Sequence, residues 1–136
     1  MDLALLDTDI LSEVIKLRNA AVQQKALAYV QIHGQIAFSA MTRYEILRGY
    51  RDTNATTQLA RFGVFCQNSL ILPVSDATFD LTADLWVAAR RGGHPSNDAD
   101  LIIAATAIEH GRVLATGNAA HFAWIANLRI EDWRQP

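Results

Sequence analysis

The stretch LALLDTD, residues 3–9, decides the fold, because four apolar residues run directly into a segment with two carboxylates. A continuous apolar run of this length predicts a strand that is buried on both faces, as in the middle of a parallel sheet. Open α/β sheets bind ligands at the carboxyl ends of their central strands. Asp7 is therefore the first residue expected to have a functional role.

The length and composition predict one domain, residues 1–136. With 51% hydrophobic residues, the chain is long enough for one sizeable core and short for two. Its formal net charge of −2, from 12 basic and 14 acidic residues, excludes a global attraction to nucleic acid or to an anionic membrane. Cys66 is the only cysteine and is expected in the core, so an intrachain disulfide and a thiolate metal cluster are excluded.

The sequence also predicts a cytoplasmic protein without a membrane segment. The chain begins Met1-Asp2-Leu3, with an acid where a secretory signal would carry basic residues. No apolar run approaches the length that spans a bilayer. The single cysteine fits a reducing compartment.

Strands and helices are predicted to alternate along the chain. This alternation favours a parallel sheet that is covered by helices on both faces and joined by right-handed crossovers. A polar loop is expected between the fourth and the last strand. After the first strand, the patterns predict strands at 36–38, 70–74, 113–115 and 128–130, helices at 10–18, 20–33, 42–51, 55–69, 76–91 and 98–110, and the polar loop at 116–121.

Acidic residues recur at strand ends and helix starts. Asp7 and Asp9 follow the first predicted strand, and Glu45 lies in the third predicted helix. Asp98 and Asp100 open the last predicted helix. Mutual repulsion at one pole of the sheet would raise the pKa values of these acids unless a cation were present. Carboxylates without thiolates or a histidine pair indicate Mg²⁺ or Mn²⁺ rather than zinc.

Helix capping is the alternative explanation for each acid when it is taken singly. The acids after the first strand can cap the helix that follows, and the helix dipole favours acids in a first turn. Thr42 with Glu45 matches a capping box, and Asn97 with Asp100 matches it in a looser form. Capping does not explain why the acids recur at the same pole of the sheet.

Four segments of the chain resemble, in order, the motifs of PIN-domain ribonucleases, and more narrowly those of VapC-type toxins of bacterial type II toxin–antitoxin pairs. Each segment alone is a weak signal, whereas the ordered set is specific. The resemblance implies a PIN-like three-layer α/β/α sandwich with a central, mostly parallel sheet of four to five strands. The segments are 5–9, 39–49, 98–107 and 116–122, and the likeness extends to the closing run 129–133.

The resemblance implies a metal-dependent endoribonuclease whose acidic residues are Asp7, Glu45 and Asp100. Asp7 and Asp100, with Glu45 nearby, would hold Mg²⁺ or Mn²⁺ largely through the ion's own waters. Glu45 would orient or deprotonate the water that attacks the phosphodiester. Other residues expected beside these acids are Thr8, Asp9, Asp98 and Thr116.

Helix geometry also bears on the choice between Asp98 and Asp100. Two helical residues that are two apart point roughly 200° away from each other, so both cannot face one ion. Asp100 is followed at helical spacing by Ala104 and Ala107, small residues that let this face approach the sheet. Asp100 is therefore the predicted ligand, and Asp98 is expected at the frayed start of the helix.

The chain departs from the family pattern after the fourth strand. Family members often carry a fourth acid in this loop, where the sequence has Asn118 and His121. An amide or an imidazole can still form hydrogen bonds, but the site has one negative charge fewer, which leaves one or two ions as alternatives. Thr116 and Asn118 are expected to position a metal-bound water.

The resemblance further implies three partners: an RNA substrate, a cognate antitoxin whose tail covers the groove of the toxin, and a second copy in a homodimer. Local phosphate contacts could come from several cationic residues, with Tyr44 stacking on an unpaired base. The alternative is that these side chains are merely solvated on helix faces. The cationic candidates are Arg43, Arg48, Arg51, Arg90, Arg91 and His94.

Two other functions compete with the nuclease. The run DTDI, residues 7–10, also resembles the nucleophile motif of haloacid-dehalogenase-type phosphatases, but that family needs a late lysine and none occurs after Lys25. The other alternative is a non-catalytic domain that binds RNA or a partner protein with a depleted acidic site, a reading that Asn118 supports. Binding of Mg²⁺ or Mn²⁺ would separate this domain from the nuclease.

Overall fold

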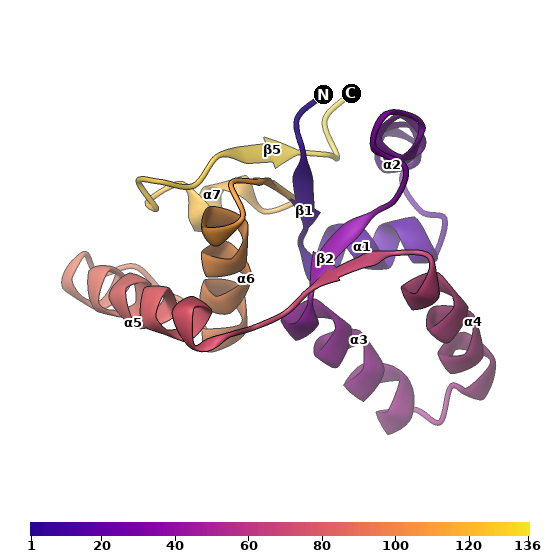
Figure 1. Ribbon diagram of the computed structural model, residues 1–136, viewed down its shortest axis with the longest axis horizontal. Helices are drawn as coiled ribbons and strands as arrows, with labels where there is room; N and C mark the ends of the chain where they lie inside the picture. Colours follow the sequence, from indigo (N-terminus) through magenta and orange to yellow (C-terminus); the bar gives the residue numbers. More distant parts are fainter.

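The central strand of the fold is β1 (Ala4–Leu6), formed by the apolar run at the start of the chain. The computed structural model describes residues 1–136 (Figure 1). β1 pairs in parallel with β4 (Val113–Thr116), which pairs in parallel with β5 (Ile130–Asp132). β2 (Ala37–Ser39) pairs in parallel with β3 (Leu70–Leu72) in a second hydrogen-bonded sheet, and β2 lies against β1, so the sheet β3-β2 lies beside the sheet β1-β4-β5. The predicted parallel sheet is confirmed.

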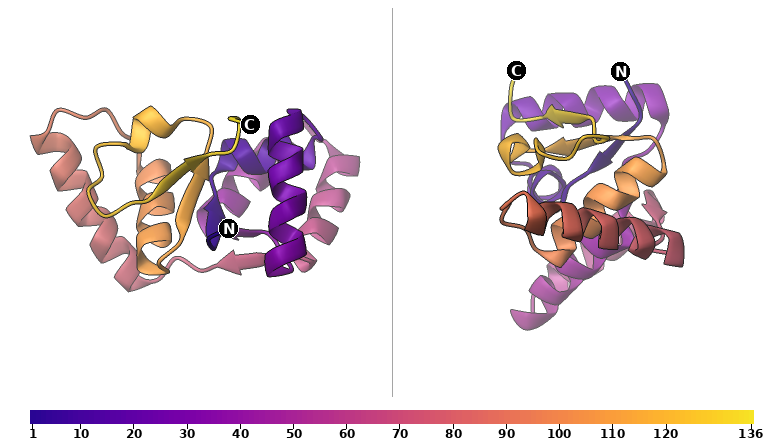
Figure 2. Two further views of the ribbon diagram at one scale, coloured as in Figure 1. Left: turned by 90° about the horizontal axis from the view of Figure 1, so that it is seen from above. Right: turned by 90° about the vertical axis from the view of Figure 1, so that its left-hand side faces the viewer.

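Helices cover both faces of this sheet, as Figures 1 and 2 show. Helices α1 to α4 lie on one side of the strands, and α5 and α6 lie on the other. This arrangement is the predicted three-layer α/β/α sandwich. No helix is long and apolar enough to cross a bilayer. The helices are α1 (Thr8–Ile15), α2 (Ala20–His33), α3 (Ala40–Asp52), α4 (Thr56–Gln67), α5 (Asp76–Arg91), α6 (Asp98–Glu109) and α7 (Ala119–Phe122).

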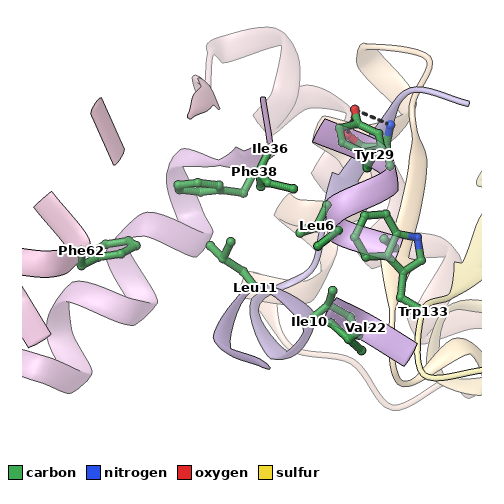
Figure 3. Close-up of a cluster of buried hydrophobic side chains, with 12 residues drawn as sticks. Leu6, Ile10, Leu11, Val22, Tyr29, Ile36, Phe38, Phe62 and Trp133 are labelled. Atoms are coloured by element: carbon green, nitrogen blue, oxygen red, sulfur yellow. Dashed lines mark hydrogen bonds between the residues drawn. The ribbon is translucent and has the colours of Figure 1, made fainter. Parts of the chain in front are cut away.

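Each face of the sheet has its own hydrophobic core. Because side chains alternate along a strand, Ala4 and Leu6 point into the core under α1 and α2, whereas Leu5 points into the core under α5 and α6. Trp133, near the end of the chain, is wholly buried in the first core (Figure 3). The hydroxyl of Tyr29 accepts a hydrogen bond of 3.1 Å from the backbone N–H of Ala4, which ties α2 to β1 (Figure 3).

Helix α6 is buried along most of its length. The seven consecutive residues Leu101–Ala107 are all buried. Three of them are alanines, and their small side chains let α6 lie close to the sheet while α5 packs on its other side. This packing fixes the first turn of α6, which carries Asp100, relative to β1.

Two predictions about the C-terminal part are wrong. The strand predicted at 128–130 lies at Ile130–Asp132, because Leu128 packs in the second core before the ladder begins opposite Leu114. The loop predicted at 116–121 contains the one-turn helix α7. A helix of this length shows no apolar periodicity in the sequence.

Replacement of Ala104 by leucine should lower the free energy of unfolding by about 1–3 kcal/mol, because extra methylenes in a filled interior force neighbouring groups to move. Ala104 is wholly buried. Ala60→Leu, on the exposed side of α4, is the matched control and should change the free energy of unfolding by less than about 0.5 kcal/mol. Urea denaturation measures both variants, and equal stabilities would contradict the close packing of α6.

Candidate active site

Asp7 lies directly after β1, where it is the N-cap of α1. Its carboxylate accepts hydrogen bonds from the backbone N–H of Thr8 at 2.8 Å and from the hydroxyl of Thr116 at 2.9 Å. Burial, and next the negative charge of Asp9, raise the pKa of Asp7 to about 7. The hydrogen bonds from Thr116 and Thr8 lower this pKa, and the charge of Asp100 raises it slightly. Asp7 therefore caps a helix and also supplies a buried carboxylate at the sheet edge.

Glu45 reaches the same region from α3. The hydroxyl of Ser39 accepts a hydrogen bond of 3.1 Å from the backbone N–H of Thr42, so α3 begins two residues before its predicted start. The predicted capping box of Thr42 with Glu45 is therefore wrong. The Glu45 carboxylate instead accepts a hydrogen bond of 2.8 Å from the hydroxyl of Thr8, and Arg48 lies 3.6 Å from its other oxygen.

Asp100 is positioned by the first turn of α6. Its backbone N–H donates to the side-chain oxygen of Asn97 at 2.9 Å, so the looser capping pair is confirmed. The amide nitrogen of Asn97 donates to Asp100 Oδ2 at 3.1 Å, and Nε2 of His121 lies 2.9 Å from that oxygen. Asp100 Oδ1 forms no hydrogen bond within the protein, so this oxygen is available to a ligand.

A cavity of about 410 Å³, called the acidic cavity below, brings these side chains together. Its walls come from the start of α1, from α3, from the first turn of α6 and from the segment after β4. Thr116 lies behind the cavity, and its hydroxyl also accepts a hydrogen bond of 3.0 Å from the backbone N–H of Asn118. The acidic cavity is lined by Asp7, Thr8, Asp9, Ser12, Glu45, Asp100, Asn118 and Phe122.

Asp98 lies apart from the acidic cavity. Its side chain is exposed and lines a separate, mostly apolar pocket together with Phe79 and Trp86 of α5. The two-residue offset from Asp100 turns the two carboxylates to different sides of α6. The expectation that Asp98 stands beside the other acids is therefore wrong.

None of the cationic residues proposed for phosphate contacts lines the acidic cavity. The guanidinium of Arg48 lies over the ring of Tyr44, 5.0 Å from its centroid, so it covers one face that a base would use. His94 stacks on Trp124 with ring centroids 4.9 Å apart. Arg48, which also pairs with Glu45, and His94 therefore already have partners within the protein.

Arg134, which the sequence did not single out, borders the site. Its guanidinium donates to Glu13 at 3.0 and 3.2 Å and to the backbone oxygen of Gly117 at 3.2 Å, and it lies 3.6 Å from Asp9. A Cβ atom at Gly117 would collide with the guanidinium, so any larger residue there would shift the end of the Arg134 side chain. No local pattern marks Arg134, because its partners belong to α1 and to the segment after β4.

The side chains of the acidic cavity fit a hard divalent cation that keeps most of its water ligands. No group of three acidic, histidine or cysteine side chains is arranged to ligate one ion directly. Mg²⁺ retains several waters and is usually bound through one or two carboxylates. Asp7 and Asp100 can supply these carboxylates. Burial and the charge of Asp9 raise the pKa of Asp7, and a cation would stabilise its ionised form, while Asp100 Oδ1 is unpartnered.

Comparisons with known proteins agree with this architecture. A family model described as the PIN domain matches residues 4–127. VapBC2 from Rickettsia felis, solved with a promoter DNA fragment, matches with a TM-score of 0.85 at 23% identity, covering 96% of this chain and 98% of that chain. DNA-bound VapBC from Salmonella typhimurium matches with a TM-score of 0.85 at 25% identity, covering 98% of this chain and 99% of that chain. FitAcB from Neisseria gonorrhoeae matches with a TM-score of 0.74 at 24% identity, covering 98% of this chain and 100% of that chain. No curated protein sequence matches the chain.

The chain belongs to the PIN domain family, since the matched residues include all the acids of the cavity. Within that family, its structure is similar over nearly its whole length to chains of the VapBC toxin–antitoxin complexes. The family match sets aside the haloacid-dehalogenase alternative, which depended on residues 7–10 alone.

The raised pKa of Asp7 predicts that the metal-free protein loses stability as the pH rises. Between the ordinary value of 3.8 and the folded-state value of about 7, the folded protein binds a proton that the unfolded chain has released. The free energy of unfolding should therefore decrease from about pH 4 to about pH 7, by up to about 4 kcal/mol, and level off above that range. Urea denaturation across this range, in the presence of a chelator, measures the change.

Asp7→Asn should remove most of this pH dependence, because the amide does not titrate. Asp80→Asn removes the same charge from an exposed position on α5 and should keep the pH dependence of the parent protein. A parent protein whose stability rises over this range would contradict the assignment to Asp7.

Proposed function

We propose that the protein is a metal-dependent endoribonuclease and acts as the toxin of a toxin–antitoxin pair. The observation that best supports this proposal is the convergence of Asp7, Glu45 and Asp100 on one cavity from three separate elements. The acids recur at the carboxyl end of the central strands, where α/β sheets bind ligands. Membership of the PIN family and the likeness to VapBC complexes support the same function.

Asp7 and Asp100 would hold Mg²⁺ or Mn²⁺ through its water ligands. The bound ion would supply a water of lowered pKa and positive charge for the phosphate oxygens. The chain's own role is to orient the two carboxylates toward the ion. Thr116 donates to Asp7, and Asn97 with His121 holds Oδ2 of Asp100, which leaves Oδ1 directed to a ligand.

Glu45 is the residue best placed to accept a proton from the attacking water. The hydroxyl of Thr8 holds one of its oxygens at the edge of the acidic cavity. As the water oxygen forms its bond to phosphorus, the proton would pass to Glu45. The P–O ester bond would break with its electron pair on the leaving ribose oxygen, which would take a proton from solvent water. Asn118, whose side chain forms no hydrogen bond within the protein, would orient the water or a phosphate oxygen.

His121 favours a single ion at this site. It occupies the segment where the family often has a fourth acid, and its Nε2 lies 2.9 Å from Asp100. An imidazole N–H at that distance stabilises the Asp100 carboxylate. A fourth carboxylate in its place would repel Asp100, and a second cation would be needed to offset the added negative charge. We therefore propose one ion where more acidic relatives could hold two.

A cognate antitoxin and a second copy of the chain are the proposed protein partners in the cytoplasm. An apolar groove of about 460 Å³ lies between α1, α2 and α4, and beside it Leu17 and Leu27 are 81% and 62% exposed. We assign this groove to the antitoxin. The exposed Phe79 and Trp86 on α5 form a second apolar face, which we assign to the homodimer.

Purified protein should cleave RNA in Mg²⁺ or Mn²⁺, and a chelator should stop the cleavage. Asp7→Asn and Asp100→Asn should each lower the cleavage rate by about 10²-fold or more, because each removes a carboxylate that would hold the ion or its waters. Gel analysis of total RNA after timed incubation measures the rates.

Asp98→Asn is the matched control, because it removes an acid two residues from Asp100 but outside the acidic cavity. It should keep the cleavage rate of the parent protein within a few-fold. Metal-dependent cleavage that survives in both site variants would refute the assignment of Asp7 and Asp100 as the residues that hold the ion. A parent protein that binds RNA but neither binds Mg²⁺ nor cuts would instead support the non-catalytic alternative.

A further inference from the structure

A second cavity, of about 370 Å³, opens from the acidic cavity and runs between α1 and α3. The two cavities share Thr8, Ser12 and Glu45, so they form one continuous depression. We call the second cavity the α1–α3 groove. Only two of the eight residues that line it are hydrophobic, so it resembles a polar binding groove rather than a protein-docking surface.

On the α1 side, the groove is lined by Thr8, Ser12 and Lys16, whose four-residue spacing puts them on one helix face. These three residues begin beside the acids, where the hydroxyl of Thr8 donates to Glu45. They end at Lys16, about 12 Å further along the helix. Lys16 is exposed, and its side chain forms no ion pair. It is the only cation among the residues that line either cavity.

On the α3 side, the same spacing gives Glu45, Gly49 and Thr53. Glycine is less favourable than alanine inside a helix, so the presence of Gly49 in α3 requires an explanation. Neither close packing nor an unusual backbone conformation explains this glycine. No atom lies within 4 Å of a Cβ built at Gly49, and the φ angle of Gly49 is not positive. The missing side chain does leave the wall of the groove open for a close approach by a ligand.

We propose that the α1–α3 groove binds the stretch of single-stranded RNA next to the cleaved bond. Lys16 contacts a backbone phosphate, and the hydroxyls of Ser12 and Thr53 form hydrogen bonds to phosphate or ribose oxygens. This inference rests on the proposed nuclease function, because the groove leads away from the acidic cavity. A groove with a cation along its path fits one strand, whereas duplex RNA is recognised by shape across its wide minor groove.

Anisotropy of a short, labelled single-stranded RNA tests the role of Lys16, with full-length Asp100→Asn protein as the uncut background. Lys16→Gln should weaken RNA binding several-fold. It should also reduce the slope of log affinity against log salt concentration by about 0.7, the value for one lost phosphate contact on a single strand. Lys16→Arg should restore both the RNA affinity and the salt dependence of the parent protein. Arg18→Gln removes an equal charge from an exposed residue outside the groove and should leave the slope unchanged.

A matched pair of glycines tests the groove itself. Gly63 in α4 is also exposed, and no atom lies within 4 Å of a Cβ built there. Because leucine favours helices over glycine, Gly49→Leu and Gly63→Leu should both melt no lower than the parent protein. Only Gly49→Leu fills the groove, so only this variant should lose affinity for the labelled RNA.

Three outcomes would overturn the inference. If Lys16→Gln and Gly49→Leu bind RNA as the parent protein does, and the protein with Asp100 intact cleaves RNA, the assignment of RNA to the α1–α3 groove is rejected. The proposed nuclease function would then remain. Variants that keep RNA affinity but escape inhibition by the antitoxin would assign the groove to that protein instead. A parent protein that neither binds nor cleaves RNA would reject the proposed function, and the groove assignment with it.

Discussion

The hydrogen bond between Asp7 and Thr116 is the contact on which the rest of the site depends. It joins the ends of β1 and β4, which are already held in register by the backbone bond from Asp7 N–H to Ala115 at 2.8 Å. Thr116 is fully buried, and its hydroxyl also accepts the backbone N–H of Asn118. One side chain therefore orients the buried carboxylate and the segment that follows β4, and the acids on α3 and α6 are arranged around this junction.

Every acid of the acidic cavity except Asp7 has a basic side chain beside it. Each of the other acids has a guanidinium or an imidazole within 4 Å, whereas Asp7 has only hydroxyl and backbone donors. Burial and the absence of a basic partner both disfavour the ionised form of Asp7 and raise its pKa. The pairs in question are Glu45 with Arg48, Asp9 with Arg134, and Asp100 with His121.

Most of this arrangement could be predicted from the sequence, because it follows from continuous patterns. The apolar run before Asp7 predicts a central strand, and the alternation of strands and helices predicts parallel pairing, which places strand ends at one edge. The errors arise where nearby residues compete for one structural role: Ser39 caps α3 in place of Thr42, and Leu128 packs in the core instead of joining the ladder. Arg134 had no local signal, because its role depends on contacts between distant segments.

The parallel topology also explains why a groove could lead away from the acids at all. Helices α1 and α3 each begin directly after a strand, β1 and β2, so both start at the same edge of the sheet. Residues at four-residue spacing on the two helices then face each other from a common origin, where Thr8 donates to Glu45. An RNA strand that entered at the acids would thereby be guided along both helices, and polar residues further along them would contact it without any change to the strands that position the acids.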